Sequence, residues 1–152
     1  MAPIRVSPII LHRETITSQT PESFPAPAQT QTPGPTPGLP PSCIPTTNNL
    51  TWRTLLSTPQ TRSTSMCAGL ATCPPHSGSL ALHRHTQAEI YYVTAGSGIV
   101  VIEGVEHEVR KGSVVFIPGD AEHGILSKGE EELEWFYVFP TGAFGDVVYR
   151  FS

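Results

Sequence analysis

Short apolar runs separated by glycine-containing turns make up the last two thirds of the chain. In several runs, such as residues 133–139, apolar and polar positions alternate or β-branched and aromatic residues dominate, which is typical of strands with a buried face. No segment keeps a 3.6-residue period, so no long helix is expected. We predict strands over residues 63–73, 80–85, 89–94, 99–103, 107–110, 113–117, 125–127, 133–139 and 147–151, and either a strand or a helical turn over 51–56. Many short strands with such turns predict an all-β sandwich or barrel.

The first third of the chain has a different pattern. Nine of the 16 prolines fall between residues 18 and 47, which predicts a polyproline-like linker or arm. Residues 4–11 are apolar but interrupted by Pro8, and they fit an edge strand or an extended arm laid on the body or on a partner subunit. We therefore divide the chain into an N-terminal strand or arm (1–17), a Pro/Thr-rich linker (18–48) and a β-domain (49–152).

Composition excludes several classes of partner. The formal net charge is -4 and no cluster of Lys and Arg occurs, so neither nucleic acid nor an anionic membrane is expected as a partner. Three cysteines, an odd number without CxxC spacing, argue against a disulfide framework and for a reducing compartment. No apolar run is long enough to span a membrane, and the N-terminus lacks a convincing signal segment. We predict a soluble, cytoplasmic protein.

The candidate chemistry begins at His83-Arg84-His85, followed by Glu89. On a strand, residues two apart point to the same face, so His83 and His85 project together, and Glu89 joins them if the chain turns around residues 86–87. Two imidazoles and a carboxylate are most of a divalent-metal site.

A fourth ligand candidate lies downstream. His123 follows a buried strand (113–117) and a proline-containing loop. If that strand lies beside residues 83–93, His123 faces the other two histidines across the barrel. Four ligands leave two positions of an octahedron open, and this ligand set suits Fe, Mn, Ni, Cu or Zn without choosing among them.

These residues resemble the two motifs of the cupin superfamily, G-x5-H-x-H-x3,4-E-x6-G and G-x5-P-x-G-x2-H-x3-N. The matching positions are His83, His85, Glu89 and Gly96 in the first motif and Gly112, Pro118 and His123 in the second. Gly78 is one position out of place, Asp120 stands where the family has glycine, and Ser127 stands where it has asparagine. Gly119 is expected to supply the turn that the missing glycine would make. The resemblance covers about residues 51–152.

The resemblance implies a single-domain jelly-roll β-barrel with one divalent metal ion near its mouth, held by His83, His85, Glu89 and His123. It also implies a homodimer formed through edge strands, to which residues 1–15 would add a swapped or augmenting strand.

Aromatic residues are predicted around that ion. Tyr91 shares the face of Glu89 and either acts on the substrate as a catalytic phenol or packs in the core. Trp135 and Tyr137 share the inward face of their strand, and with Tyr91 they form the predicted substrate pocket. Asp120 or Glu122 could orient the His123 imidazole from behind.

The leading functional hypothesis is a metal-dependent enzyme that acts on a small molecule. We favour a dioxygenase-like oxidoreductase with a phenolic or apolar substrate, because the predicted lining is aromatic and has no inward Lys or Arg. The alternatives are a non-redox lyase, isomerase or decarboxylase, and a non-catalytic cupin that binds a metal or another ligand.

Overall fold

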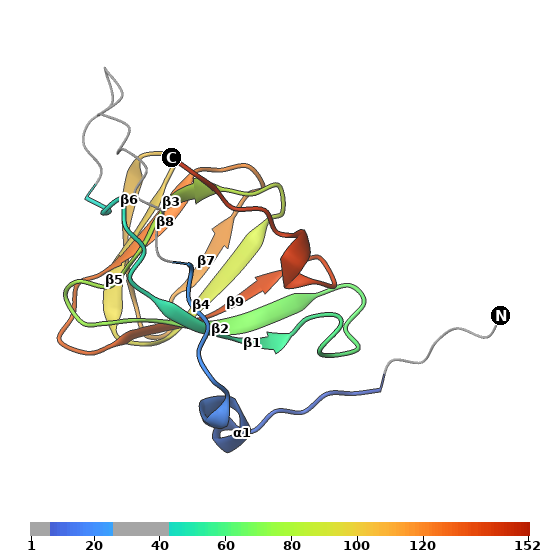
Figure 1. Cartoon of the computed structure of the whole chain (residues 1–152). Helices are drawn as coiled ribbons and strands as arrows, with labels where there is room; N and C mark the ends of the chain where they lie inside the picture. Colours follow the sequence, from blue (N-terminus) through green and yellow to red (C-terminus); the bar gives the residue numbers. More distant parts are fainter. Residues whose placement is uncertain (1–6, 26–42) are drawn as a thin grey trace.

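Two five-stranded antiparallel sheets face each other and enclose the core (Figure 1). This computed structural model describes residues 7–25 and 43–152 of the chain. The first sheet has the order β1-β2-β9-β4-β7, and the second has the order β10-β3-β8-β5-β6. The strands are β1 (Thr51–Leu56), β2 (Cys67–Cys73), β3 (Ser79–Arg84), β4 (Glu89–Ala95), β5 (Ser97–Ile102), β6 (Val105–Arg110), β7 (Val114–Ile117), β8 (His123–Ser127), β9 (Leu133–Phe139) and β10 (Arg150–Phe151). The predicted all-β jelly-roll barrel is confirmed.

The predicted strands differ from the observed ones mainly at their ends. Residues 51–56 form a strand, whereas the strand predicted over 63–73 begins only at Cys67. The strand predicted over 147–151 shortens to β10, which follows a single 3-10 turn, η1 (Phe144–Asp146).

Alternating burial along the central strands explains why the sheets pack face to face. Every second residue of β9, from Leu133 to Phe139, is buried, and Tyr91 and Val93 of β4 point into the same interior. Side chains two apart on a strand share a face, so one face of each strand enters the core. Cys67 and Cys73 of β2 are free and fully buried. Burial raises the pKa of the Cys67 thiol to about 11 and that of the Cys73 thiol to about 12. Both thiols are therefore protonated and fit packing rather than nucleophilic roles.

The N-terminal part lies against the first sheet. Residues 7–12 form no strand, and α1 (Arg13–Ser18) follows them. Glu22 then forms an isolated antiparallel bridge with Trp52 of β1. Residues 1–6 and most of the predicted linker, residues 26–42, lie outside the described part, so the threefold division of the chain stays a prediction. Neither helix of the described part is long and apolar enough to cross a membrane.

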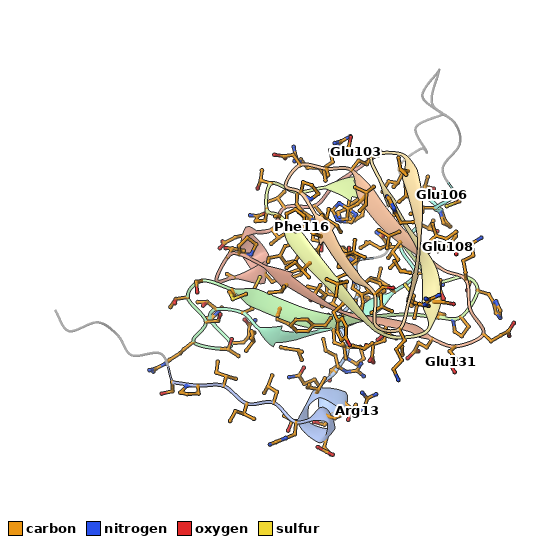
Figure 2. All side chains as sticks on the ribbon, turned by 180° about the vertical axis from the view of Figure 1, so that it is seen from behind. Arg13, Glu103, Glu106, Glu108, Phe116 and Glu131 are labelled. Atoms are coloured by element: carbon orange, nitrogen blue, oxygen red, sulfur yellow. The ribbon has the colours of Figure 1, made fainter. Side chains whose placement is uncertain are left out.

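One outer face of the barrel is apolar at a sheet edge. Ile90 and Tyr92 of β4 lie opposite Phe116 and Val114 of the edge strand β7, and all four side chains are exposed. The edge strand β6 of the second sheet carries Glu106 and Glu108 instead (Figure 2), and such charges discourage pairing between edges. The homodimer expected from the family resemblance stays a prediction.

We expect Gly69→Ala to destabilise the fold by about 1–3 kcal/mol, the usual cost of overpacking. An added Cβ would lie 2.1 Å from the Tyr137 hydroxyl oxygen and 2.7 Å from the Arg53 carbonyl oxygen. Urea unfolding measures the effect. Gly145→Ala is the control, because its Cβ would meet nothing within 4 Å. Equal stability of the two variants would contradict this packing.

Candidate metal centre and its cavity

The four predicted ligands come from both sheets and from one link between them. His83 on β3 is paired in register with His123 on β8, and His85 lies just after the end of β3. Glu89 begins β4 in the opposite sheet. His123 therefore lies beside His83 on the neighbouring strand. The prediction that it faces the other histidines across the barrel is wrong. The group that faces the histidines from the other sheet is Glu89.

The side chains converge on one buried point. One ring nitrogen from each of His83, His85 and His123 lies within 4.8 Å of the other two. The Glu89 Oε2 atom is 3.2 Å from His85 Nε2 and 3.3 Å from His123 Nε2. All four residues are at most 2% exposed. The turn around residues 86–87 thus brings Glu89 to the histidines, as the motif predicts.

Each imidazole is oriented by a backbone carbonyl. The Nδ1 atoms of His83, His85 and His123 lie 2.8, 2.9 and 2.8 Å from the carbonyl oxygens of Ala81, Gln87 and Ala121 respectively. If each Nδ1–H donates, the tautomer is set and every Nε2 lone pair is left for the common centre. The backbone therefore has the orienting role that we predicted for Asp120 or Glu122.

The acids beside His123 have other partners. Asp120 accepts a hydrogen bond of 2.6 Å from Arg150, and Glu122 accepts one from Ser152. Arg84 points away from the site and donates to Glu103 at 3.0 Å. These contacts tie the C-terminal strand to the loop before β8.

The turn of the second motif is made by Asp120 itself. Its φ of 62° lies in the left-handed region, which aspartate tolerates better than most residues. Gly119, which we predicted would take this conformation, is required for another reason. A Cβ there would lie 2.3 Å from the Thr86 carbonyl oxygen, so the two ligand-bearing loops approach too closely for a side chain.

The electrostatics of the cluster fit a divalent ion. His83 Nε2 and His123 Nε2 are buried and have no hydrogen-bond partner among the described residues. Burial, and then the neighbouring His123, lowers the pKa of His83 to about 2, so its imidazole is neutral and available as a ligand. Neutral imidazoles with unshared lone pairs and one carboxylate suit a transition metal. The cluster does not identify which ion binds.

An aromatic cavity adjoins the cluster. It has a volume of about 20 Å³, and its wall includes Glu89, Tyr91, Trp135 and Tyr137. The structure therefore places all three predicted pocket residues together beside a predicted ligand. The remaining lining residues are Phe24, Leu50, Trp52, Ala71, Leu80, Phe144 and Tyr149.

Tyr149 is the main site residue that the sequence analysis missed. Its ring stacks on His83, with centroids 4.6 Å apart and an interplanar angle of 25°. It lies in the segment 147–151, which we predicted as a strand, but no motif or spacing singled out its side chain, and β10 begins only after it. Burial, and then the charge of Glu89, raises the pKa of both Tyr91 and Tyr149 well above its ordinary value. Both phenols are neutral in the protein alone.

The cavity has no cationic side chain. Within residues 7–25 and 43–152, no Lys or Arg is buried, and Glu89 is the one buried acid. A ligand can therefore meet positive charge in this cavity only from an ion bound by the cluster.

Comparisons with known proteins agree with this architecture. The Cupin domain family profile matches residues 69–139. A relative named dimethylsulfoniopropionate lyase DddW, from Ruegeria pomeroyi, is 43% identical over 108 residues, which cover 71% of this chain and 70% of that protein. The oxalate-binding protein of Thermotoga maritima is 32% identical over 65 residues, 42% of this chain and 54% of its own length.

Solved structures show the same fold. The polyketide cyclase RemF from Streptomyces resistomycificus superposes with a TM-score of 0.66 at 22% identity, covering 93% of this chain and 85% of that one. A predicted oxalate decarboxylase from Thermotoga maritima gives 0.55 at 27% identity, covering 60% and 80%.

We expect the metal-free protein to lose stability as the pH falls below about 6.5. Between that value and the folded pKa of about 2, the unfolded chain binds a proton at His83 and the folded chain does not. The free energy of unfolding then decreases by about 1.4 kcal/mol per pH unit for this one group. Urea unfolding between pH 7.5 and 5 measures the slope. His107→Ala, at an exposed histidine of β6, is the control for losing a histidine, and a flat profile in the wild type would rule out a buried neutral His83.

Proposed function

The chain belongs to the cupin family, and from this premise we propose that it is a metal-dependent lyase that cleaves a small sulfonium carboxylate such as dimethylsulfoniopropionate. The observation that carries the proposal is a cluster of three imidazoles and one carboxylate beside an aromatic cavity without Lys or Arg. The similarity to DddW supports the choice of reaction.

The charges of this substrate suit the site. It carries a carboxylate at one end and a sulfonium at the other. His83, His85, Glu89 and His123 would hold the ion that receives the carboxylate. The sulfonium can lie against aromatic faces, such as those of Trp135 and Tyr149, because a cation is attracted to the face of a ring. A buried Lys or Arg would repel it.

A zwitterionic substrate also weakens the case for a dioxygenase. The prediction of oxygen chemistry depends on the assumption that a carboxylate substrate needs a buried Lys or Arg. A zwitterionic substrate removes that need, since its own positive end is better served by rings. The dioxygenase stays a prediction, and the lyase is the better supported alternative because of the similarity to DddW.

The proposed reaction is an elimination. A divalent ion held by His83, His85, Glu89 and His123 would act as a Lewis acid and make the C–H beside the carboxylate more acidic. We assign removal of that proton to the Tyr91 oxygen. The electron pair left on carbon forms the double bond of acrylate, the C–S bond breaks, and dimethyl sulfide leaves with the bonding pair. No oxidant and no water is consumed.

Tyr91 suits this role because it lies in the cavity wall near Glu89. Its raised pKa means that its conjugate base is a strong one, as removal of a weakly acidic carbon-bound proton requires. Burial and the Glu89 charge oppose ionisation, so we expect the phenolate to form only when positive charge is present at the cluster.

We expect the protein reconstituted with Fe, Mn, Ni, Cu or Zn in turn to convert dimethylsulfoniopropionate to dimethyl sulfide and acrylate in equal amounts under anaerobic conditions. Headspace gas chromatography and proton NMR measure the products. His123→Ala should abolish both metal retention and product formation, and the exposed His107→Ala should change neither. Oxygen uptake with phenols would favour the dioxygenase. Metal binding without turnover of either substrate class would favour the non-catalytic alternative.

We expect Tyr91→Phe to lower kcat by about 10²- to 10⁴-fold, the usual contribution of a positioned acid or base. Bound metal, measured by elemental analysis, should stay the same because no ligand is removed. Tyr92→Phe is the matched control, since the adjacent Tyr92 is 45% exposed on the outer face. An unchanged kcat in Tyr91→Phe would show that another group moves the proton.

A further inference from the structure

We propose that Phe24, carried by the N-terminal arm, closes the cavity beside the metal-ligand cluster and sets the size of the molecule that reaches it. From here on, the arm means residues 19–25, which follow α1 and belong to the stretch predicted as the linker (18–48). It lies outside the stretch matched by the cupin profile, residues 69–139.

The arm is anchored to β1 by few contacts. Glu22 and Trp52 exchange two backbone hydrogen bonds of 2.7 and 2.9 Å. The Glu22 carboxylate also accepts a hydrogen bond of 2.6 Å from the Thr54 hydroxyl, and Arg53 donates to the Gln19 carbonyl at 3.1 Å. Figure 1 shows this segment rising from α1 to the barrel.

Phe24 is the side chain that the arm turns inward. Among residues 20–25 it is the one that is not exposed. Its ring centroid lies 4.8 Å from that of Trp52 and 5.4 Å from those of Tyr149 and Phe151. Tyr149 in turn stacks on His83. Phe24 is thus separated from a ligand imidazole by a single ring.

The cavity behind Phe24 is too small for a substrate. Its volume of about 20 Å³ holds about one water molecule. Dimethylsulfoniopropionate, or any other organic ligand of the cluster, is several times larger. One wall must therefore move before a ligand binds.

The arm is a wall that can move without disturbing either sheet. Tyr91 and Trp135 lie on β4 and β9, each of which is hydrogen-bonded to a strand on both sides. The arm is bridged to an edge strand at Glu22 alone. Pro21 and Pro25 flank this point, and proline has no N–H with which to extend the pairing. Displacing Phe24 therefore breaks few hydrogen bonds and leaves both sheets intact.

The first test does not depend on the proposed reaction. The full-length protein is loaded with Zn²⁺, and the release of Zn²⁺ to excess EDTA is followed with a chromogenic indicator. Phe24→Ala should release the ion several-fold faster than the wild type, and Phe116→Ala, an exposed phenylalanine on the outer face (Figure 2), should release it at the wild-type rate. Equal rates for Phe24→Ala and the wild type would overturn the proposal.

A second variant keeps the ring and loosens its anchor. Glu22→Ala removes the carboxylate that binds Thr54 and should also speed release, and adding Thr54→Val should have no further effect. This result would connect the faster release to the anchored arm rather than to damage caused by losing an aromatic side chain. Wild-type release rates in Glu22→Ala would count against the anchoring contact.

The role of Phe24 in selecting ligands by size is tested by enzyme kinetics. This third test rests on the proposed lyase function. The ratio of kcat/KM for the diethyl sulfonium analogue to that for dimethylsulfoniopropionate should rise about tenfold or more in Phe24→Ala, as expected when room for methylene groups is created. An unchanged ratio would overturn the role in size selection. If the wild type cleaves neither compound, the lyase proposal fails, while the rates of Zn²⁺ release still decide whether Phe24 covers the site.

Discussion

Three contacts between imidazole Nδ1 atoms and backbone carbonyls hold the candidate site together. They join His83, His85 and His123 to carbonyls two residues away in each case. Each partner is part of the main chain, so the orientation of the ring is tied to the path of the strand or loop itself. A buried imidazole without such a partner would be free to rotate or to exchange tautomers. With a carbonyl partner at each Nδ1 atom, the three Nε2 atoms point to one place. No additional side chain is needed to orient the imidazoles.

The barrel also explains why the cluster tolerates burial. Two Nε2 atoms without a hydrogen bond and one carboxylate, all nearly inaccessible to solvent, are costly in an ordinary core. A bound cation would satisfy them together. The surrounding rings exclude water and raise the pKa of Tyr91 and Tyr149, while no Lys or Arg neutralises Glu89 from within the described core. Only a bound ion and its ligand would therefore balance the charge of Glu89 in the cavity. The proposed zwitterionic substrate suits such a cavity, because its carboxylate would bind the ion and its sulfonium would meet no buried cation.

Both ends of the described chain contribute to the cavity. Phe24 comes from the N-terminal arm, and Phe144 and Tyr149 come from the segment after β9. The central strands supply the predicted ligands, Tyr91, Trp135 and Tyr137, whereas these outer segments narrow the space beside them. Such a division allows relatives with the same metal-binding pattern to differ in the molecules that they admit, because the segments at the mouth can change without disturbing the sheets.

The β-rich architecture and the four candidate ligands can be predicted from the amino-acid pattern alone. Alternation in β9 and the spacing of His83, His85 and Glu89 are local properties, and strand geometry converts them directly into faces and neighbours. The position of His123 beside His83, the left-handed turn at Asp120 and the stacking of Tyr149 were decided by tertiary structure. Each depends on which strands pair or on how distant loops approach. Phe24 is the clearest case, because a single aromatic residue in a proline-rich stretch has no periodicity, and only its contacts with Trp52 and Tyr149 place it at the site.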